Sequence, residues 1–158
     1  MEDKLTRSEY IGLVYVDVIR ACKGTGLFPS LMIAQGILES GNGNSKLARV
    51  YNNHFGIKAS KGWTGDEALM PTVEYVNKKP VSVKAPFRSY PTLEKGFRDR
   101  VNFLQVNPRY AKAGVFAAKT PAEQARCFQT AGYATDPAYA SLLISIMKGS
   151  QLEHFDAM

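Results

Sequence analysis

The sequence lacks any apolar stretch long enough to cross a membrane. A spanning helix needs about 20 consecutive apolar residues, and every apolar stretch here is interrupted well before that length. The first residues, MEDKLTRSEY, are polar and of mixed charge, which is not the composition of a secretory leader. We therefore expect no integral membrane segment. If the protein is exported, we expect a route that needs no such leader.

Residues that bind metals are also scarce. The only histidines are His54 and His154, and the only cysteines are Cys22 and Cys127. None of them has the spacing of a zinc-binding motif, so the sequence predicts neither a metal site nor another cofactor. Both cysteines occupy helix-like positions among apolar neighbours, which favours two buried free thiols over a disulfide.

Charge is unbalanced but not clustered. Lysine and arginine total 20 against 14 aspartate and glutamate, a formal net charge of +6. This balance favours polyanionic partners, namely nucleic acid, anionic membranes or bacterial cell wall. Lys78 and Lys79 form the one adjacent basic pair, so we interpret the charge mainly as a solubility feature.

Most of the chain has a helical pattern. Thr6–Glu9 has the form of a capping box and predicts a first helix. A second helix begins at Pro29 and ends at the glycine-rich SGNG segment. Further helices are predicted after Pro91, after a second capping box at Thr120–Glu123, and after Asp136. The predicted buried stripes are Ile11, Val14, Val18 and Cys22; Leu31, Ala34, Ile37 and Leu38; Leu93, Phe97, Val101 and Leu104; and Tyr139, Leu142, Leu143, Ile146 and Met147.

One segment has the pattern of strands instead. Between Ala68 and Tyr90, β-branched and aromatic residues flank a turn-forming NKKP segment, which predicts a β-hairpin. No repeat, linker or low-complexity segment interrupts the 158 residues, a length that usually forms one domain. We therefore predict a single α+β domain over residues 1–158, mostly helical with one β-hairpin lobe.

Glu39 has the properties of a catalytic acid. It lies in the last turn of the apolar second helix and is the only acidic residue between Asp17 and Asp66. The unpaired carbonyls and the negative dipole end of a helix C-terminus disfavour a carboxylate, and so do apolar neighbours. Both effects raise the expected pKa, as a general acid near neutral pH requires. Taken alone, a surface glutamate on an amphipathic helix is the simpler interpretation.

Glycoside hydrolases usually need a second carboxylate across the scissile bond, and the hairpin offers Glu74. In a regular strand it points away from the face that carries Val73 and Tyr75. A solvated strand residue is again the simpler interpretation. Asp66 and Glu67, on a predicted loop, are alternatives that spacing does not distinguish.

The segment YNNHFGIK, residues 51–58, is rich in side chains that recognise sugars. Asn53 can bond to sugar hydroxyls and acetamides, while Phe55 and Trp63 can stack on apolar sugar faces. Gly56 allows the backbone to approach a ligand closely. Core packing and a turn explain the same segment equally well.

The segment AGYATDPAYA, residues 131–140, combines a helix stop with a helix start. This structural role explains Gly132, Asp136 and Pro137 without any function. It leaves Tyr133 on the connecting loop, where its hydroxyl can orient a substrate acetamide or a carboxylate.

Five segments occur together and in order: AQGILESGNGNSKLA, YNNHFGIK, TVEY, APFRSYPTLEKGF and AGYATDPAYASLL. Through them the sequence, from about Pro29 to Leu152, closely resembles the endo-β-N-acetylglucosaminidases of glycoside hydrolase family 73. That family includes flagellar peptidoglycan hydrolase domains. The resemblance implies a lysozyme-like fold and cleavage of the β-1,4 bond between N-acetylglucosamine and N-acetylmuramic acid in peptidoglycan.

The resemblance also implies residue roles. The family's general acid falls on Glu39, its second carboxylate on Glu74, and a tyrosine associated with catalysis or substrate positioning on Tyr133. The segment that lines the family's cleft, with two further aromatic candidates, gives the predicted substrate-binding residues Asn53, Phe55, Gly56, Trp63 and Tyr139. One position departs from the family pattern, since His54 replaces an apolar residue. We interpret it as a tolerated surface change rather than a pH-responsive group.

Other functions are compatible with parts of this pattern. A muramidase or lytic transglycosylase would use the same fold and a single glutamate. A non-catalytic cell-wall-binding module is disfavoured by the presence of Glu39, Glu74 and Tyr133 together. A nucleic-acid binder rests on charge alone and lacks a recognised motif, so we predict no nucleic-acid partner.

The expected place of action is the bacterial cell wall or periplasm. We expect a monomer released by a holin, or injected by a dedicated secretion system with an immunity or inhibitor protein as partner. A catalytic domain excised from a longer protein is the third setting.

Overall fold

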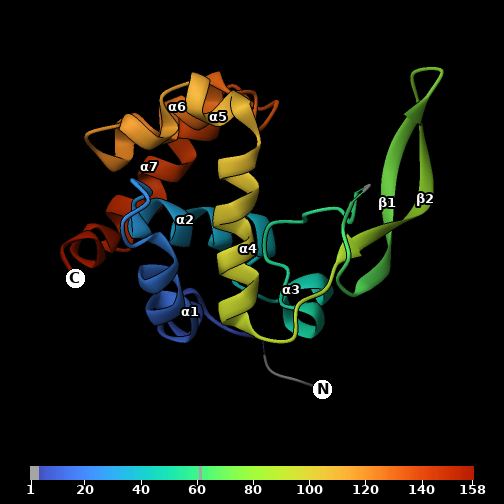
Figure 1. The fold of residues 1–158 in the computed structure, drawn as a ribbon, viewed down its shortest axis with the longest axis horizontal. Helices are drawn as coiled ribbons and strands as arrows, with labels where there is room; N and C mark the ends of the chain where they lie inside the picture. Colours follow the sequence, from blue (N-terminus) through green and yellow to red (C-terminus); the bar gives the residue numbers. More distant parts are fainter. Residues whose placement is uncertain (1–3, 61) are drawn as a thin grey trace.

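The computed structural model describes residues 4–60 and 62–158. A helical body carries one two-stranded antiparallel hairpin that projects from it (Figure 1). This arrangement confirms the predicted α+β class. The elements are α1 (Arg7–Cys22), α2 (Pro29–Ser40), α3 (Lys46–Tyr51), β1 (Glu67–Val76), β2 (Lys79–Arg88), α4 (Leu93–Val106), α5 (Pro108–Lys112), η1 (Val115–Ala117), α6 (Pro121–Thr130), α7 (Tyr139–Gly149) and η2 (Leu152–Ala157).

Helix α2 forms the centre of the core. It is apolar on nearly all sides and contacts α1, α6, α7 and η2. A glycine suits position 36 within it, because a Cβ there would overlap the hydroxyl oxygen of Tyr10. Gly41 ends the helix in the left-handed conformation, with φ of 58°. Leu38 was predicted on the buried face but is 38% exposed, because it lies on a side of α2 that the core does not cover, whereas Ile37 and Ser40 are buried.

His54 is buried rather than a surface substitution, so that interpretation was wrong. Its side chain is 5% exposed, and its Nδ1 lies 2.7 Å from the Tyr10 hydroxyl. Tyr10 and Phe97 pack against the imidazole, with ring centroids 5.5 and 5.2 Å away. Burial lowers the pKa of His54 to about 4, so the ring is neutral near pH 7.

The predicted helix starts are only partly correct. Thr6 and Glu9 form the full capping box of α1. Thr120 accepts the Glu123 N–H at α6, but the Glu123 carboxylate accepts the Lys119 N–H instead of closing the box. Helix α7 begins later than predicted, at Tyr139, and its Leu142 is exposed.

The hairpin is anchored at its base and exposed toward its turn. Residues 77 and 78, both with positive φ, form a two-residue turn whose twist suits antiparallel strands. At the base Ala68, Ala85 and Phe87 are buried. Arg88, at the end of β2, donates from Nη1 to Asp99 Oδ2 of α4 at 2.9 Å. This pair ties the base of the hairpin to the helical body.

The two cysteines are free thiols, as predicted. Cys22 is buried, whereas Cys127 is only half-buried. In the described part of the chain, every helix is too short or too polar to traverse a bilayer.

Candidate active site

A cleft of about 660 Å³ brings together the end of α2, the loop after α3, helices α4 and α5, and the loop before α7. Four parts of the chain that are distant in sequence therefore supply one surface: the end of α2, the loop after α3, the α4–α5 region and the loop before α7. The lining residues are Glu39, Phe55, Gly56, Ile57, Lys58, Ser60, Arg100, Phe103, Arg109, Tyr110, Gly132, Tyr133, Ala134 and Thr135.

Glu39 supplies the only carboxyl group of this lining. It lies in the last turn of α2, where the helix dipole disfavours a negative charge. The side chain stays accessible from the open side of the cleft, yet the surrounding protein partly desolvates it. Burial therefore raises the pKa of Glu39, and the positive charge of Arg100 opposes this effect. The group is accessible to a ligand and retains its proton to higher pH than an ordinary glutamate.

Tyr133 lies in the cleft with Glu39, as the sequence predicted for its loop position. Its hydroxyl accepts a hydrogen bond of 2.8 Å from Nη1 of Arg100. Burial raises the pKa of Tyr133, so the phenol remains protonated and is able to donate a hydrogen bond.

Arg100 is a residue of the site that the sequence reasoning missed. It is 1% exposed and lies on α4 between the buried Phe97 and Leu104. Its Nη2 donates to Gln35 Oε1 at 3.0 Å. An arginine on the apolar stripe of an amphipathic helix was the available signal, since a buried cation needs specific partners.

Tyr139 lies behind the cleft rather than on its surface. The residue is 3% exposed, and its hydroxyl accepts a hydrogen bond of 3.2 Å from Gln35 Nε2. Its ring packs beside that of Tyr133, with centroids 5.5 Å apart. Tyr139 is placed to support Tyr133, and direct contact with a sugar stays a prediction.

The loop after α3 supplies Phe55 and Gly56 to the cleft but not Asn53. The Asn53 side chain is buried, donates to Ile57 O and Arg88 O at 2.9 Å each, and accepts the Ile57 N–H. Both of its amide hydrogens are thereby used within the protein. Gly56 adopts a φ of 64° and has open space where a side chain would project. Asn53 therefore holds the loop that Gly56 and Phe55 present to the cleft.

Glu74 is outside the cleft lining, on strand β1. Its Oε1 lies 4.0 Å from Nζ of Lys58, a residue that does line the cleft. Val73 and Tyr75 are exposed on the opposite face of the strand. The hairpin therefore directs Glu74 to the side of the strand that is nearer to Lys58.

Trp63 lines a neighbouring hollow that shares Ser60 and Phe103 with the cleft. The guanidinium of Arg88 covers one face of its indole, 4.5 Å from the ring centroid, and the indole N–H donates to Asp66 O. The Tyr90 ring also packs against the indole, with centroids 5.8 Å apart, so stacking of a sugar on Trp63 stays a prediction.

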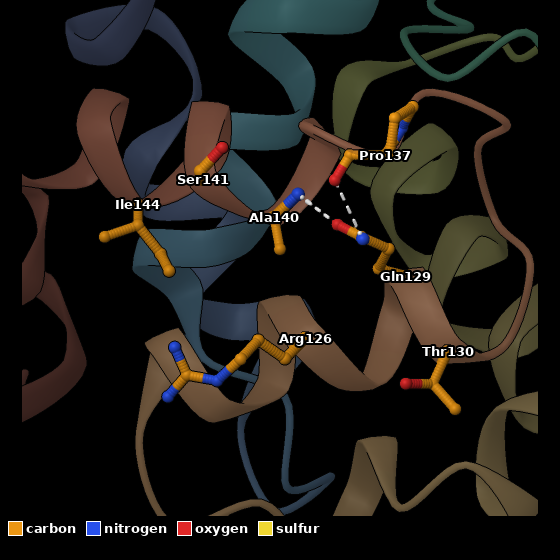
Figure 2. A pocket seen from close by; sticks show the side chains of 7 residues that line it. All are labelled: Arg126, Gln129, Thr130, Pro137, Ala140, Ser141 and Ile144. Carbon is orange, nitrogen blue, oxygen red and sulfur yellow. Dashed lines mark hydrogen bonds between the residues drawn. The ribbon is translucent and has the colours of Figure 1, made fainter.

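A separate cavity of about 490 Å³ lies between α6 and α7 (Figure 2). The side-chain amide of Gln129 is already occupied there, because it donates to Pro137 O and accepts the Ala140 N–H. No residue of its lining carries a carboxyl group. Of these two cavities, only the Glu39 cleft has a carboxyl group in its lining.

Comparisons with known proteins point to one family. Residues 16–152 match the glucosaminidase family, described as mannosyl-glycoprotein endo-beta-N-acetylglucosaminidase. Peptidoglycan hydrolase FlgJ of Vibrio cholerae is 39% identical over 130 residues, which cover 80% of this chain and 39% of the relative. A probable N-acetylmuramidase of Lactococcus lactis subsp. cremoris is 41% identical over 137 residues, which cover 83% of this chain and 31% of the relative. The chain thus spans well under half the length of either relative.

A solved structure resembles nearly the whole fold. The catalytic domain of the autolysin Auto from Listeria monocytogenes superposes with a TM-score of 0.84 at 32% identity, over 99% of this chain and 91% of that structure. The similarity includes both the helical body and the hairpin lobe, because the coverage of this chain is almost complete.

Proposed function

The chain belongs to the glucosaminidase family, glycoside hydrolase family 73, and we propose that it hydrolyses the glycan strands of peptidoglycan. The bond cleaved is the β-1,4 linkage between N-acetylglucosamine and N-acetylmuramic acid. The observation that carries this proposal is the Glu39 carboxyl, which is accessible in a cleft and has a raised pKa. Such a group is protonated when substrate arrives and able to act as general acid.

In the proposed reaction Glu39 donates its proton to the glycosidic oxygen as the bond to the anomeric carbon breaks. Glu74 activates the attacking water or stabilises the positive charge that develops on the sugar ring. Its link to the cleft-lining Lys58 supports this role. This role requires the hairpin to swing toward the cleft during the reaction. A separation of about 5–5.5 Å between the two carboxyl groups in that state would favour retention, and about 6.5–9.5 Å would favour inversion.

Tyr133 would position the substrate in this reaction. Its protonated hydroxyl, already held by Arg100, has a hydrogen to donate to an acetamide oxygen. Phe55 and Gly56 would form the wall against which the sugar lies. Asn53 would contribute through the loop that it holds, and Tyr139 through its packing against Tyr133.

A second candidate is cleavage of the other glycan linkage, which the name of the Lactococcus relative favours. The same general acid would serve a muramidase. A lytic transglycosylase would also use one acid but would leave a 1,6-anhydro sugar.

The proposed substrate places the activity in the bacterial cell wall. We propose that residues 1–158 act as one domain and as a monomer, since a single chain supplies every residue of the cleft lining. An inhibitor protein, if the chain is an injected effector, would have to cover this cleft. A net charge of +6 suits a polyanionic wall.

Digestion of purified cell walls tests the proposal. The products are reduced with borohydride, and the sugar at each new end is identified by mass spectrometry. Reduced N-acetylglucosamine at the new ends is the expected result. Reduced N-acetylmuramic acid would establish the muramidase, a 1,6-anhydro end the transglycosylase, and the absence of new ends a non-catalytic module.

A further inference from the structure

Arg100 is a buried cation without an anionic partner. The residue is 1% exposed, and no carboxylate among residues 4–60 and 62–158 lies within 4.0 Å of its guanidinium. Its Nε has no hydrogen-bond acceptor. Removing a cation from water is unfavourable unless an anion or a full set of acceptors replaces the solvent. A structural role alone therefore gives little reason for a charge at this position.

Neutral groups hold the guanidinium in one place. Its two terminal nitrogens donate to the Tyr133 hydroxyl at 2.8 Å and to Gln35 Oε1 at 3.0 Å. Its Cζ lies 4.2 Å from the ring centroid of Phe55 and 4.9 Å from that of Tyr133, which is cation–π geometry. These contacts orient the group but leave its unit charge uncompensated.

Glu39 is the carboxyl group that shares the cleft with this charge. Arg100 lowers the pKa of Glu39, against the larger effect of burial. No second carboxyl lies in the cleft lining to compete for the guanidinium. The other charged or titratable groups in that lining are Lys58, Arg109, Tyr110 and Tyr133. Outside the lining, Tyr139 and the Cys22 thiol also interact electrostatically with Arg100.

We infer that Arg100 is a positioning residue of the active site, placed to stabilise the carboxylate that Glu39 becomes after proton donation and to hold the Tyr133 hydroxyl. This inference rests on the proposed hydrolase function. On this inference, the anionic partner of Arg100 is a carboxylate that forms during the reaction and is absent from the resting protein.

The proton transfer from Glu39 explains how the positive charge of Arg100 contributes to the reaction. The Oε–H bond of Glu39 breaks and its proton bonds to the glycosidic oxygen, while the electron pair of the broken glycosidic bond remains on that oxygen. Water then supplies hydroxide to the anomeric carbon and a proton that restores the acid. Before the transfer Arg100 shares the cleft with a neutral acid, and after it with a carboxylate. An interaction that strengthens as the reaction proceeds lowers the barrier.

The first test compares Arg100→Met with Arg98→Met. Arg98 is a matched control, because it lies on the same helix, is exposed and donates from Nε to Glu94 Oε1 at 3.0 Å. We expect Arg100→Met to lower kcat on cell-wall glycans by about 10²-fold. The alkaline limb of its kcat–pH profile should move to higher pH, because the charge that lowers the pKa of Glu39 is gone. Arg100→Lys should keep the wild-type limb and recover part of kcat.

A second variant avoids the risk that Arg100→Met fails to fold. Gln35→Glu preserves shape and gives Arg100 a carboxylate at the position where Gln35 Oε1 now accepts at 3.0 Å. The local positive charge is then neutralised without removing the buried side chain. We expect kcat to fall and the alkaline limb to move in the same direction as in Arg100→Met.

The outcomes separate this inference from the proposed function. A folded Arg100→Met or Gln35→Glu protein with the wild-type kcat and alkaline limb would overturn the role of Arg100. Inactivity of the wild-type protein on cell walls would instead overturn the hydrolase. In that case a ¹³C NMR titration of the Glu39 carboxyl, wild type against Gln35→Glu, still measures the coupling, and identical titration curves would refute it.

Discussion

The Lys58 ammonium lies 4.0 Å from the Glu74 carboxylate and so connects the hairpin to the cleft that contains Glu39. Both side chains are about half exposed, at 54% and 52%. Pairs this exposed contribute at most about 1 kcal/mol to folding. The contact therefore matters for placing Glu74 rather than for stability.

Replacing Glu74 should separate activity from stability. We expect Glu74→Gln to lower kcat by about 10²-fold, because general base or charge-stabilising groups contribute on that scale, with an unchanged melting temperature. Glu153→Gln, at an exposed glutamate of η2 outside the cleft lining, is the control. Equal kcat values for the two variants would show that Glu74 is not the second carboxylate.

Removing the Tyr133 hydroxyl should affect both turnover and folding. Tyr133→Phe keeps the ring but leaves a charged donor of Arg100 without its acceptor, which destabilises the protein by about 1–3 kcal/mol. We expect kcat to fall at least about tenfold, since the loss of one positioned hydrogen bond typically costs that much. Urea denaturation and kinetics on cell walls measure the two effects. Tyr15→Phe, which packs on Phe155 away from the cleft, should leave both at wild-type values.

His54 should make folding stability depend on pH. The unfolded chain binds a proton near the ordinary pKa of 6.5, whereas the folded chain binds it only near 4. Stability from this group is thus complete above pH 6.5 and is lost as the pH falls toward 4, by about 3 kcal/mol in total. The measurement is the free energy of unfolding across this pH range, compared between the wild type, His54→Gln and the exposed control His154→Gln. A His54→Gln protein that loses as much stability as the wild type would contradict the assignment.

The sequence was sufficient for the features that depend on neighbours along the chain. The capping box at Thr6, the hairpin turn and the end of α2 at Gly41 are all local, and the structure contains each of them. The raised pKa of Glu39 was predictable in the same way, because its position at a helix end and its apolar neighbours follow from the local sequence. The position of Tyr133 on a loop followed from the helix stop and start around it.

Features that depend on tertiary contacts were not predictable in this way. His54 and Asn53 looked available for solvent or sugar until the Tyr10 hydroxyl and the Arg88 carbonyl were placed beside them. The contacts of Arg100 form only when α2, α4 and the loop with Tyr133 come together in the folded chain. The location of Glu74 depends on how the hairpin leaves the body, which no local pattern encodes.

The most direct measurement is the turnover of purified cell walls by Glu39→Gln, with Glu94→Gln as an exposed control. Glutamine keeps the shape of the side chain but has no proton to donate, so we expect a loss of about 10³-fold or more with unchanged melting temperature. In the wild type, turnover should decline as the pH rises through the raised pKa of Glu39. A Glu39→Gln protein that retains most of its activity would show that Glu39 is not the general acid.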